Sequence, residues 1–320
     1  MIENLFSFFV IIALGVLFQI LKPAQIDADT ARRVINAIVI KFMMPALCFR
    51  VISTMAIDRN TIFFPLSAIL TVLVVLVLTY FVINIMGLFV RIRRRQRGAL
   101  LLTATFGNVT FFGLPILTTL YGQSAEKFPL MYDFLGAGTL MWTVGAAIAA
   151  YFGAVPRQKE IFGGIKRGLK TILLNPPIWA LVLAFIANFC GLGARLPHPI
   201  LTVLTMLSAP VIPLMIFSVG LCLKVPRLKD FTLAAPAVII KIVVSPIIGF
   251  FIAHFLGLTG LALKASTLEA GLPVMIMTLA LSLQYGLDHK LAALATVLSL
   301  LAAFVSIPLI AGLLEGGSLL

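Results

Sequence analysis

The tripeptide Gly113-Leu114-Pro115 occurs again as Gly271-Leu272-Pro273, and each copy precedes a Tyr-Gly pair, at Tyr121-Gly122 and Tyr285-Gly286. Proline lacks a backbone N–H and clashes with the preceding turn, so it interrupts a helix. Interrupted backbone cannot face lipid, because its polar groups would have no partners there. Matched interruptions in two halves of a chain indicate the binding site of a membrane transporter, where two broken helices cross. Ordinary kinked helices are the alternative, since Gly and Pro are common in membrane helices.

The residues around these tripeptides are far more apolar than those of a water-soluble domain. Of 320 residues, 61% are hydrophobic and 11% are charged, and the mean hydropathy is +1.15. A soluble domain has roughly half apolar and a quarter charged residues, so a soluble fold is excluded. A helix needs about 20 apolar residues to cross a membrane. The sequence predicts ten such helices, at residues 4–22, 31–55, 62–90, 98–123, 128–154, 172–191, 197–223, 231–255, 260–285 and 289–314.

The ten predicted helices divide into two similar sets of five. The Gly-Leu-Pro copies fall in the fourth and ninth helices, and prolines interrupt the second helix (Pro45) and the seventh (Pro210 and Pro213). An odd number of helices in each set places the second set upside down in the membrane. We therefore expect an all-α integral membrane protein with a 5+5 inverted repeat and crossing fourth and ninth helices. Residues 1–156 form the first repeat, 157–170 a cytoplasmic linker and 171–320 the second repeat.

The charge distribution predicts the topology. The chain has 24 Lys and Arg against 11 Asp and Glu, a formal charge of +13. When loops are assigned alternately to two faces, one face receives seventeen of the basic residues and the other five. Short basic loops stay cytoplasmic, so both termini are expected on the non-cytoplasmic side. The run Arg91–Arg97 lies between two helices without interleaved aromatic residues, which indicates topology and not nucleic-acid binding.

Four charged residues lie within predicted membrane helices, where an ionised side chain is costly and therefore often functional. Glu269 is four residues before Pro273 and is either a coupling or gating group or a structural partner of a lysine. Asp133 shares a face with Gly136 and Ala137 and is either part of this group or an interfacial residue. Ser266 and Thr267 belong to the same stretch as Glu269, and the coupled ion, if any, is sodium or a proton.

The other two intramembrane charges are lysines. Lys41 shares a helical face with Pro45 and Cys48, so we expect it to point into the bundle. Lys41 and Lys241 could each bind a substrate carboxylate or pair with an acidic group. The alternative for both is that the side chain extends to the membrane interface.

The fourth helix carries the best candidates for substrate binding. The Asn108 amide has both a donor and an acceptor, as binding a carboxylate requires. Asn108, Thr110 and the backbone near Gly113 are expected to contact substrate together with the residues of the two interruptions, Pro115, Gly271 and Pro273. The alternative for Asn108 is a hydrogen bond between helices.

The segment from Asn108 to Pro115 resembles the Asn-x-x-Phe-x-Gly-x-Pro signature of the auxin efflux carrier family. Further similarities are Pro45-Ala46-Leu47, Asn175-Pro176 and Ser218-Val219-Gly220-Leu221. The resemblance implies a ten-helix secondary carrier with inverted repeats, similar in fold to bile-acid symporters and sodium/proton antiporters. Glu269-Ala270-Gly271 is similar to the Glu-x-Gly that bile-acid symporters use around sodium. The short linker resembles the bacterial form of the family, which includes malate and malonate carriers.

The expected function is secondary active transport of a small organic anion, a carboxylate, across the inner membrane by alternating access. A membrane-embedded enzyme and a passive anion channel are the alternatives; an enzyme is disfavoured because the chain lacks a His-Glu-x-x-His or Ser/His/Asp pattern. The cysteines and histidines are dispersed, so no metal site and no cofactor are expected. The expected partners are the substrate and the lipid bilayer, with a homodimer left open and no nucleic acid.

Overall fold

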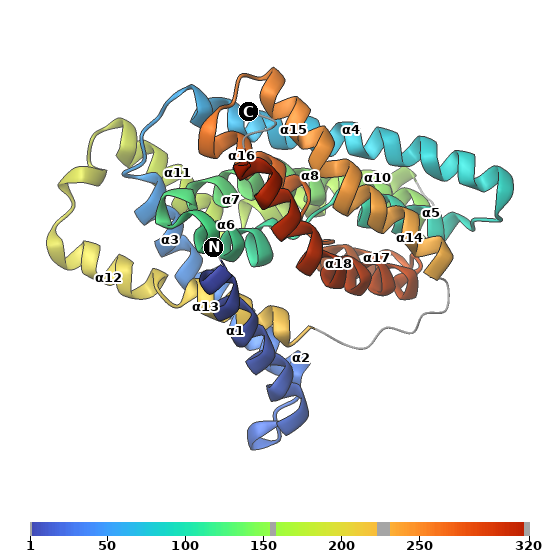
Figure 1. Ribbon diagram of the computed structural model, residues 1–320, viewed down its shortest axis with the longest axis horizontal. Coiled ribbons are helices and arrows are strands. Elements are labelled where there is room, and N and C mark those ends of the chain that lie inside the picture. The colour runs from blue at the N-terminus through green and yellow to red at the C-terminus, as the bar shows by residue number, and fades with distance from the viewer. Residues whose placement is uncertain (1, 154–157, 223–230, 317–320) are drawn as a thin grey trace. The chain divides into compact units, whose positions relative to one another are not determined.

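The computed structural model describes residues 2–153, 158–222 and 231–316, and the regular elements within these ranges are helices (Figure 1). The first part of the chain contains α1 (Ile2–Leu21), α2 (Ala28–Ile38), η2 (Val39–Met43), α3 (Met44–Ile52), α4 (Arg59–Phe89), α5 (Arg94–Thr105), η3 (Val109–Gly113), α6 (Leu114–Tyr121), α7 (Lys127–Tyr132), η5 (Asp133–Ala137), α8 (Gly138–Leu140), η6 (Met141–Gly145) and α9 (Ala146–Phe152). The second part contains α10 (Gln158–Leu173), α11 (Pro176–Phe189), α12 (His198–Ser208), α13 (Val211–Gly220), α14 (Phe231–Ile239), η8 (Ile240–Val244), α15 (Ser245–Phe255), α16 (Gly260–Ala270), α17 (Met277–Tyr285) and α18 (His289–Glu315).

Six continuous helical stretches among the described residues are long and apolar enough to cross a membrane. They are Ala28–Ile52, Arg59–Phe89, Gln123–Phe152, His198–Gly220, Phe231–Phe255 and His289–Glu315. A seventh candidate is the pair Gly163–Leu173 and Pro176–Phe189, which is bent by 56°. The predicted fourth and ninth helices are each divided into two shorter helices, so length alone does not identify them as spans. The protein is therefore a helical membrane protein, and the count of ten spans stays a prediction.

Prolines explain three of the wide π-helical turns. The turns η2, η3 and η8 each end two residues before a proline, at Pro45, Pro115 and Pro246. Proline offers no N–H to the carbonyl four residues earlier and its ring clashes with that carbonyl. An i→i+5 turn relieves the clash, at the cost of one extra residue that shifts the register of the helix.

The chain divides into two compact units that each draw on both halves of the sequence. Unit 1 contains residues 1–57, 110–130 and 172–224, and unit 2 contains 58–109, 131–171 and 225–320. In unit 1, α1 crosses α13 closely at two glycines: a Cβ added to Gly15 would lie 2.8 Å from the Cα of Gly220. Small residues permit such close contact between membrane helices. The Gln19 amide also donates to the Gly220 carbonyl (2.8 Å).

Another contact in unit 1 joins α11 to the end of α3. The Asn188 amide donates to the carbonyls of Ile52 and Met55, both at 2.8 Å. These carbonyls lie at and beyond the C-terminus of α3, where the helix itself supplies no donors. Asn188 therefore satisfies the backbone groups that the end of the helix leaves free.

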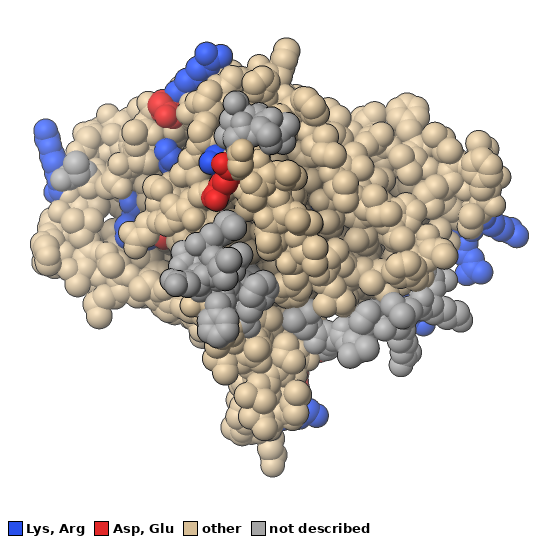
Figure 2. Space-filling model, in the orientation of Figure 1, with Lys and Arg blue, Asp and Glu red and all other residues tan. Residues whose placement is uncertain are grey.

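In unit 2, the helices α4, α5, α14, α15, α16 and α18 pack around a core that includes Phe64 and Phe106, both fully buried. Phe64 packs edge-on against Tyr132, with ring centroids 5.9 Å apart. A second set of large apolar side chains is exposed, with Phe89 and Phe255 each more than 80% exposed. Figure 2 shows uncharged residues over most of the visible face. An exposed apolar surface of this kind fits a lipid environment.

Candidate functional site

The two interrupted helices of unit 2 meet through their backbones. Helix α5 ends at Thr105, and α16 ends at Ala270 before α17 begins at Met277. The N–H of Asn108 donates to the Pro273 carbonyl (2.8 Å), and the N–H of Met275 donates to the Phe106 carbonyl (2.9 Å). Gly107 and Val274 form an antiparallel bridge between these bonds. Each interruption thus supplies partners for backbone groups that the other leaves free, as a low-dielectric interior requires.

The first interruption lies earlier in the chain than its tripeptide suggested. Residues 106–108 leave the helix, whereas Pro115 lies in the first turn of α6, after the π turn η3. The π turn η3 runs directly into α6 and accommodates Pro115 within one helical segment, Val109–Tyr121. In the second half, Gly271-Leu272-Pro273 itself lies in the non-helical segment. The two tripeptides therefore have different local roles.

Lys241 places a positive charge at the C-terminal end of α16. Its ammonium donates to the carbonyl of Ala270 at 2.7 Å, and the Ser245 hydroxyl donates to the same oxygen at 2.8 Å. Lys241 is 3% exposed. A cation at this position is favourable because the last carbonyls of a helix carry partial negative charge.

Gly107 gives Lys241 the space to reach this carbonyl. A Cβ added to Gly107 would lie 2.9 Å from Cε and 3.0 Å from Nζ of Lys241. Any larger residue would crowd the lysine side chain. We call this site the crossing. It consists of the paired residues 106–108 and 273–275, the Lys241 ammonium and the end of α16 at Ala270.

Glu269 is a buried carboxyl group that interacts electrostatically with Lys241. It is 1% exposed, and neither of its carboxylate oxygens has a hydrogen-bond partner among the residues that the structure describes. The charged groups that interact electrostatically with the Glu269 carboxyl group are Asp133 and Lys241. The Tyr132 hydroxyl interacts with the same carboxyl group. Asp133 is buried as well, on η5. Two carboxyl groups and one ammonium thus share the interior of unit 2.

Ser266 and Thr267 are buried near Glu269 but already have hydrogen bonds. The Ser266 and Ser67 hydroxyls lie 2.9 Å apart, which connects α16 to α4. The Thr267 hydroxyl donates to the Leu263 carbonyl in its own helix (2.9 Å). These bonds stabilise the position of α16, and both hydroxyl oxygens keep a free lone pair.

The remaining predicted substrate residues are divided between the two units. Asn108 (4% exposed), Gly271 and Pro273 belong to unit 2 and lie in the crossing. Thr110, Gly113 and Pro115 are in unit 1, where they form the start of the continuation of the same broken helix. Thr110 and Gly113 are buried.

The expectation that Lys41 points into the bundle is corrected by the structure. Lys41 is exposed, whereas Cys48 is fully buried. Lys41 lies in the π turn η2, which adds one residue to the turn before Pro45. Lys241 lies in the equivalent π turn before Pro246 and is buried, so the π turn alone does not account for the exposure of Lys41. The Lys41 ammonium can instead extend along the surface, which was the alternative.

Two residues that contribute hydrogen bonds to the crossing, Ser245 and Ser299, were not predicted from the sequence. Ser245 donates to the Ala270 carbonyl, as described above, and the Ser299 hydroxyl accepts from the N–H of Val274 (2.9 Å). Serines commonly satisfy backbone groups freed by an interruption in a membrane helix. A serine within an otherwise apolar predicted span was therefore a usable but unspecific signal.

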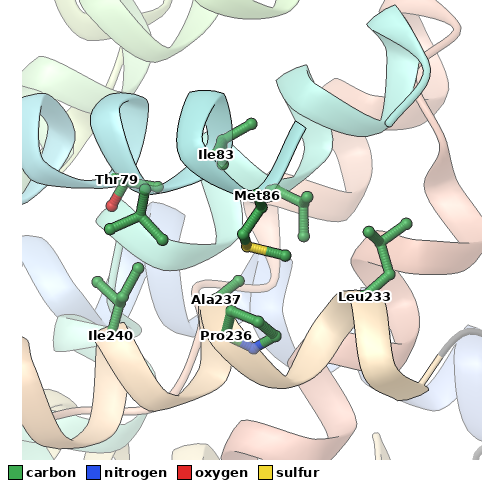
Figure 3. A pocket seen from close by; sticks show the side chains of 9 residues that line it. Thr79, Ile83, Met86, Leu233, Pro236, Ala237 and Ile240 are labelled. Atoms are coloured by element: carbon green, nitrogen blue, oxygen red, sulfur yellow. The ribbon is translucent and has the colours of Figure 1, made fainter. Parts of the chain in front are cut away.

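A separate crevice in unit 2 has no polar character suited to an anion. It lies between α4, α5 and α14, with an empty volume of about 190 Å³ that is partly open to the outside. Figure 3 shows side chains of α4 and α14 facing each other across it, among them Ile83, Met86 and Leu233. Its polar residue Thr79 donates to the Val75 carbonyl of its own helix. The crossing, with its buried charges, is therefore the better candidate site.

The described residues contain no group of three or more His, Cys, Asp or Glu side chains arranged to hold a metal ion. The fold and the crossing together define a helical membrane protein in which the interruptions of two discontinuous helices pair with each other. Residues 1–311 match the family described as "Membrane transport protein". The chain belongs to this family, the auxin efflux carrier and membrane transport family, which confirms the resemblance found in the sequence.

Two relatives support this assignment. An "Uncharacterized transporter" of Methanothermobacter thermautotrophicus is 26% identical over 316 residues, which cover 96% of each chain. "Uncharacterized transporter MJ1031" of Methanocaldococcus jannaschii is 29% identical over 267 residues, 82% of each chain. This protein is thus similar to transporters along most of its length.

Proposed function

We propose that this protein is a secondary active transporter that carries a small organic anion, a carboxylate, across the cell membrane by alternating access. The observation that carries the proposal is the pairing of residues 106–108 with 273–275 beside the buried ammonium of Lys241. Interrupted helices that cross in this way form the substrate sites of many secondary transporters. The membership in a membrane transport family supports the same function.

We further propose ten spans in two inverted repeats of five, with both termini on the non-cytoplasmic side. Unit 1 contains the first two predicted spans of each half, and unit 2 contains the last three. The exception is residues 110–130, which cover the end of the fourth span, the loop after it and the start of the fifth. Equivalent spans from the two halves thus fall in the same unit, which is the division that a repeated architecture would produce. Two units of this kind are also what alternating access needs.

The proposed anion site lies at the crossing. The Asn108 side chain is buried there, and Lys241 has three N–H donors, of which the Ala270 carbonyl uses one. The N-terminus of α17 begins three residues beyond Val274 and contributes partial positive charge. The Asn108 amide and the two N–H donors of Lys241 that the Ala270 carbonyl does not use favour a carboxylate substrate. The backbone at Gly271 and Pro273 completes this group, and Thr110, Gly113 and Pro115 continue the chain from Asn108.

Glu269 is the proposed coupling group, and the contacts around it favour a proton over sodium. A sodium ion needs several oxygen ligands, as hard cations do. The last carbonyl of α16, at Ala270, already accepts from Lys241 and Ser245. A proton needs only one of the carboxylate oxygens of Glu269, which have no hydrogen-bond partner among the described residues. The groups that face it are Asp133, Lys241 and Tyr132.

The test is uptake of radiolabelled malonate and malate by proteoliposomes that contain the purified protein. We expect saturable flux, lost in Asn108→Ala and kept in the matched control Asn84→Ala. The Asn84 amide donates to the Tyr80 carbonyl on α4 and lies outside the crossing. Normal flux in Asn108→Ala would refute the site. Conductance that does not saturate would indicate a channel, and chemical conversion of the substrate would indicate an enzyme.

Coupling is tested in the same vesicles. We expect an inward proton gradient to change the flux of the wild type and not that of Glu269→Gln, with no effect of sodium in either protein. Flux that depends on sodium would overturn the assignment of Glu269 as a proton carrier. Flux that ignores both gradients would leave Glu269 with a structural role.

A further inference from the structure

Helix α10 has one face that packs closely against the rest of unit 2. A Cβ added to Gly168 would overlap the carbonyl oxygen of Trp142. One turn earlier, a Cβ at Gly164 would lie 3.2 Å from the Tyr285 hydroxyl and 3.4 Å from the Ala146 carbonyl. Both glycines are buried. This face of α10 (Figure 1) is therefore occupied by protein.

The opposite side of α10 is exposed and contains two kinds of residue. Leu169 and Leu173 are 47% and 60% exposed, and Lys166 and Lys170 are exposed as well. With about 100° between successive residues, the two leucines lie side by side and the two lysines lie next to them. The exposed side thus passes from an apolar strip to a basic strip, which is the pattern of a helix that lies in a membrane interface.

The contacts of the neighbouring residues leave the two lysines available. Arg167 is directed to Tyr285: its guanidinium lies 5.7 Å from the ring centroid, and Nη2 donates to the hydroxyl at 3.4 Å. Neither Lys166 nor Lys170 has a partner among the residues that the structure describes. Within the described part of the chain, no acidic side chain pairs with either lysine.

A tryptophan, a residue typical of the membrane–water interface, contacts the end of α10. The indole N–H of Trp179, at the start of α11, donates to the carbonyl of Leu173 (2.6 Å). Trp179 is otherwise mostly exposed, and tryptophan is enriched where a membrane helix meets the headgroup region. Helix α10 therefore ends where an apolar helix begins, and the two helices are bent by 56° at this point.

We propose that α10 lies in the membrane interface and that Lys166 and Lys170 bind the headgroups of anionic phospholipids. Leu169 and Leu173 then contact the upper acyl chains, and the glycine face keeps the helix attached to unit 2. Charge complementarity selects the partner, since two exposed lysines attract an anionic leaflet and not a zwitterionic one. This surface is separate from the crossing and does not depend on the transported substrate.

Of the two tryptophans in the sequence, Trp179 has its indole against the last turn of α10, so its fluorescence reports on lipid bound there. The test reconstitutes the full chain in vesicles that contain brominated phosphatidylglycerol or, at the same mole fraction, brominated phosphatidylcholine. We expect stronger quenching by phosphatidylglycerol in the wild type. The relative association constant should fall about fivefold for each lysine removed, and therefore approach unity in Lys166→Gln/Lys170→Gln.

The matched control is Lys127→Gln/Arg195→Gln, which removes the same charge from residues outside α10 and should keep the preference. A wild type quenched equally by the two lipids would overturn the proposal, as would an unchanged preference in the α10 variant. A second measurement needs no variant: the preference of the wild type should decrease as salt increases, because these exposed charges are screened. A preference independent of salt would also overturn the proposal.

Discussion

Replacing Lys241 with Met tests whether the ammonium stabilises the end of α16. The Ala270 carbonyl accepts from Lys241 at 2.7 Å and from Ser245 at 2.8 Å. A hydrogen bond from a charged group contributes about 1.5–3 kcal/mol, but burying an ammonium costs part of that amount. Met keeps most of the apolar stem, so we expect Lys241→Met to lower the free energy of unfolding by about 1 kcal/mol.

The decisive measurement is the double variant Lys241→Met/Ser245→Ala. Each single variant leaves the Ala270 carbonyl with one donor, and Ser245→Ala alone should cost about 1 kcal/mol. The double variant removes both donors, and a buried carbonyl without a donor costs a further 1–3 kcal/mol or so. We therefore expect the double variant to be destabilised by about 1–2 kcal/mol more than the sum of the single variants.

The assay is a double-mutant cycle from unfolding midpoints in one detergent, with denaturant slopes measured for each variant. Thr143→Ala is the control partner for Lys241→Met, because the Thr143 hydroxyl donates to Thr139 in its own helix at 2.8 Å. That pair should be additive to within about 0.5 kcal/mol. Additive effects of Lys241→Met and Ser245→Ala would refute the shared role of the Ala270 carbonyl.

Three further predictions follow from close contacts. Gly107→Ala should lower the unfolding midpoint by the equivalent of about 1–3 kcal/mol, because the new Cβ would lie only 2.9 Å from Cε and 3.0 Å from Nζ of Lys241. A midpoint equal to that of the wild type would show that Lys241 moves freely. Gly168→Ala should detach α10 and raise its sensitivity to protease. Gly163→Ala is the control: its Cβ would meet nothing closer than 3.8 Å, so protease sensitivity should stay unchanged or decrease. Equal digestion of the two variants would contradict the packing. Asn188→Ala removes two hydrogen bonds from the end of α3 and should lower the free energy of unfolding by about 1–3 kcal/mol, measured by thermal unfolding. An unchanged midpoint would exclude this role of Asn188.

The interruptions of the two broken helices were predictable because proline acts locally. Pro273 ends the helix near the place that the sequence indicates, and the repeated tripeptide identified both helices as unusual. The position of the first interruption was not predictable in the same way. The π turn η3 accommodates Pro115 inside a helical segment, and the chain leaves the helix earlier, at 106–108, where it pairs with the second interruption. That pairing joins residues more than 150 positions apart, and no local pattern encodes it.

The intramembrane charges were found by hydropathy alone, but their environments were not. Lys41 and Lys241 have similar apolar surroundings in the sequence, yet Lys41 is exposed and Lys241 is buried. Both lysines lie in π turns, so the contact of Lys241 with the Ala270 carbonyl is what distinguishes it from Lys41. Glu269 was recognised as unusual, but the absence of hydrogen bonds to its carboxylate from the described residues emerged only from the packed helices.

The sequence by itself determined the membrane class, the interrupted helices and the family, because hydropathy and helix breaking depend on residues close together in the chain. The tertiary structure alone decided which backbone groups pair across the interruptions, which lysine is buried, and that Ser245 and Ser299 complete the crossing. These contacts form between distant segments, and the need to satisfy every buried polar group selects them. Local sequence specifies where helices break, and the packed interior specifies which groups the breaks bring together.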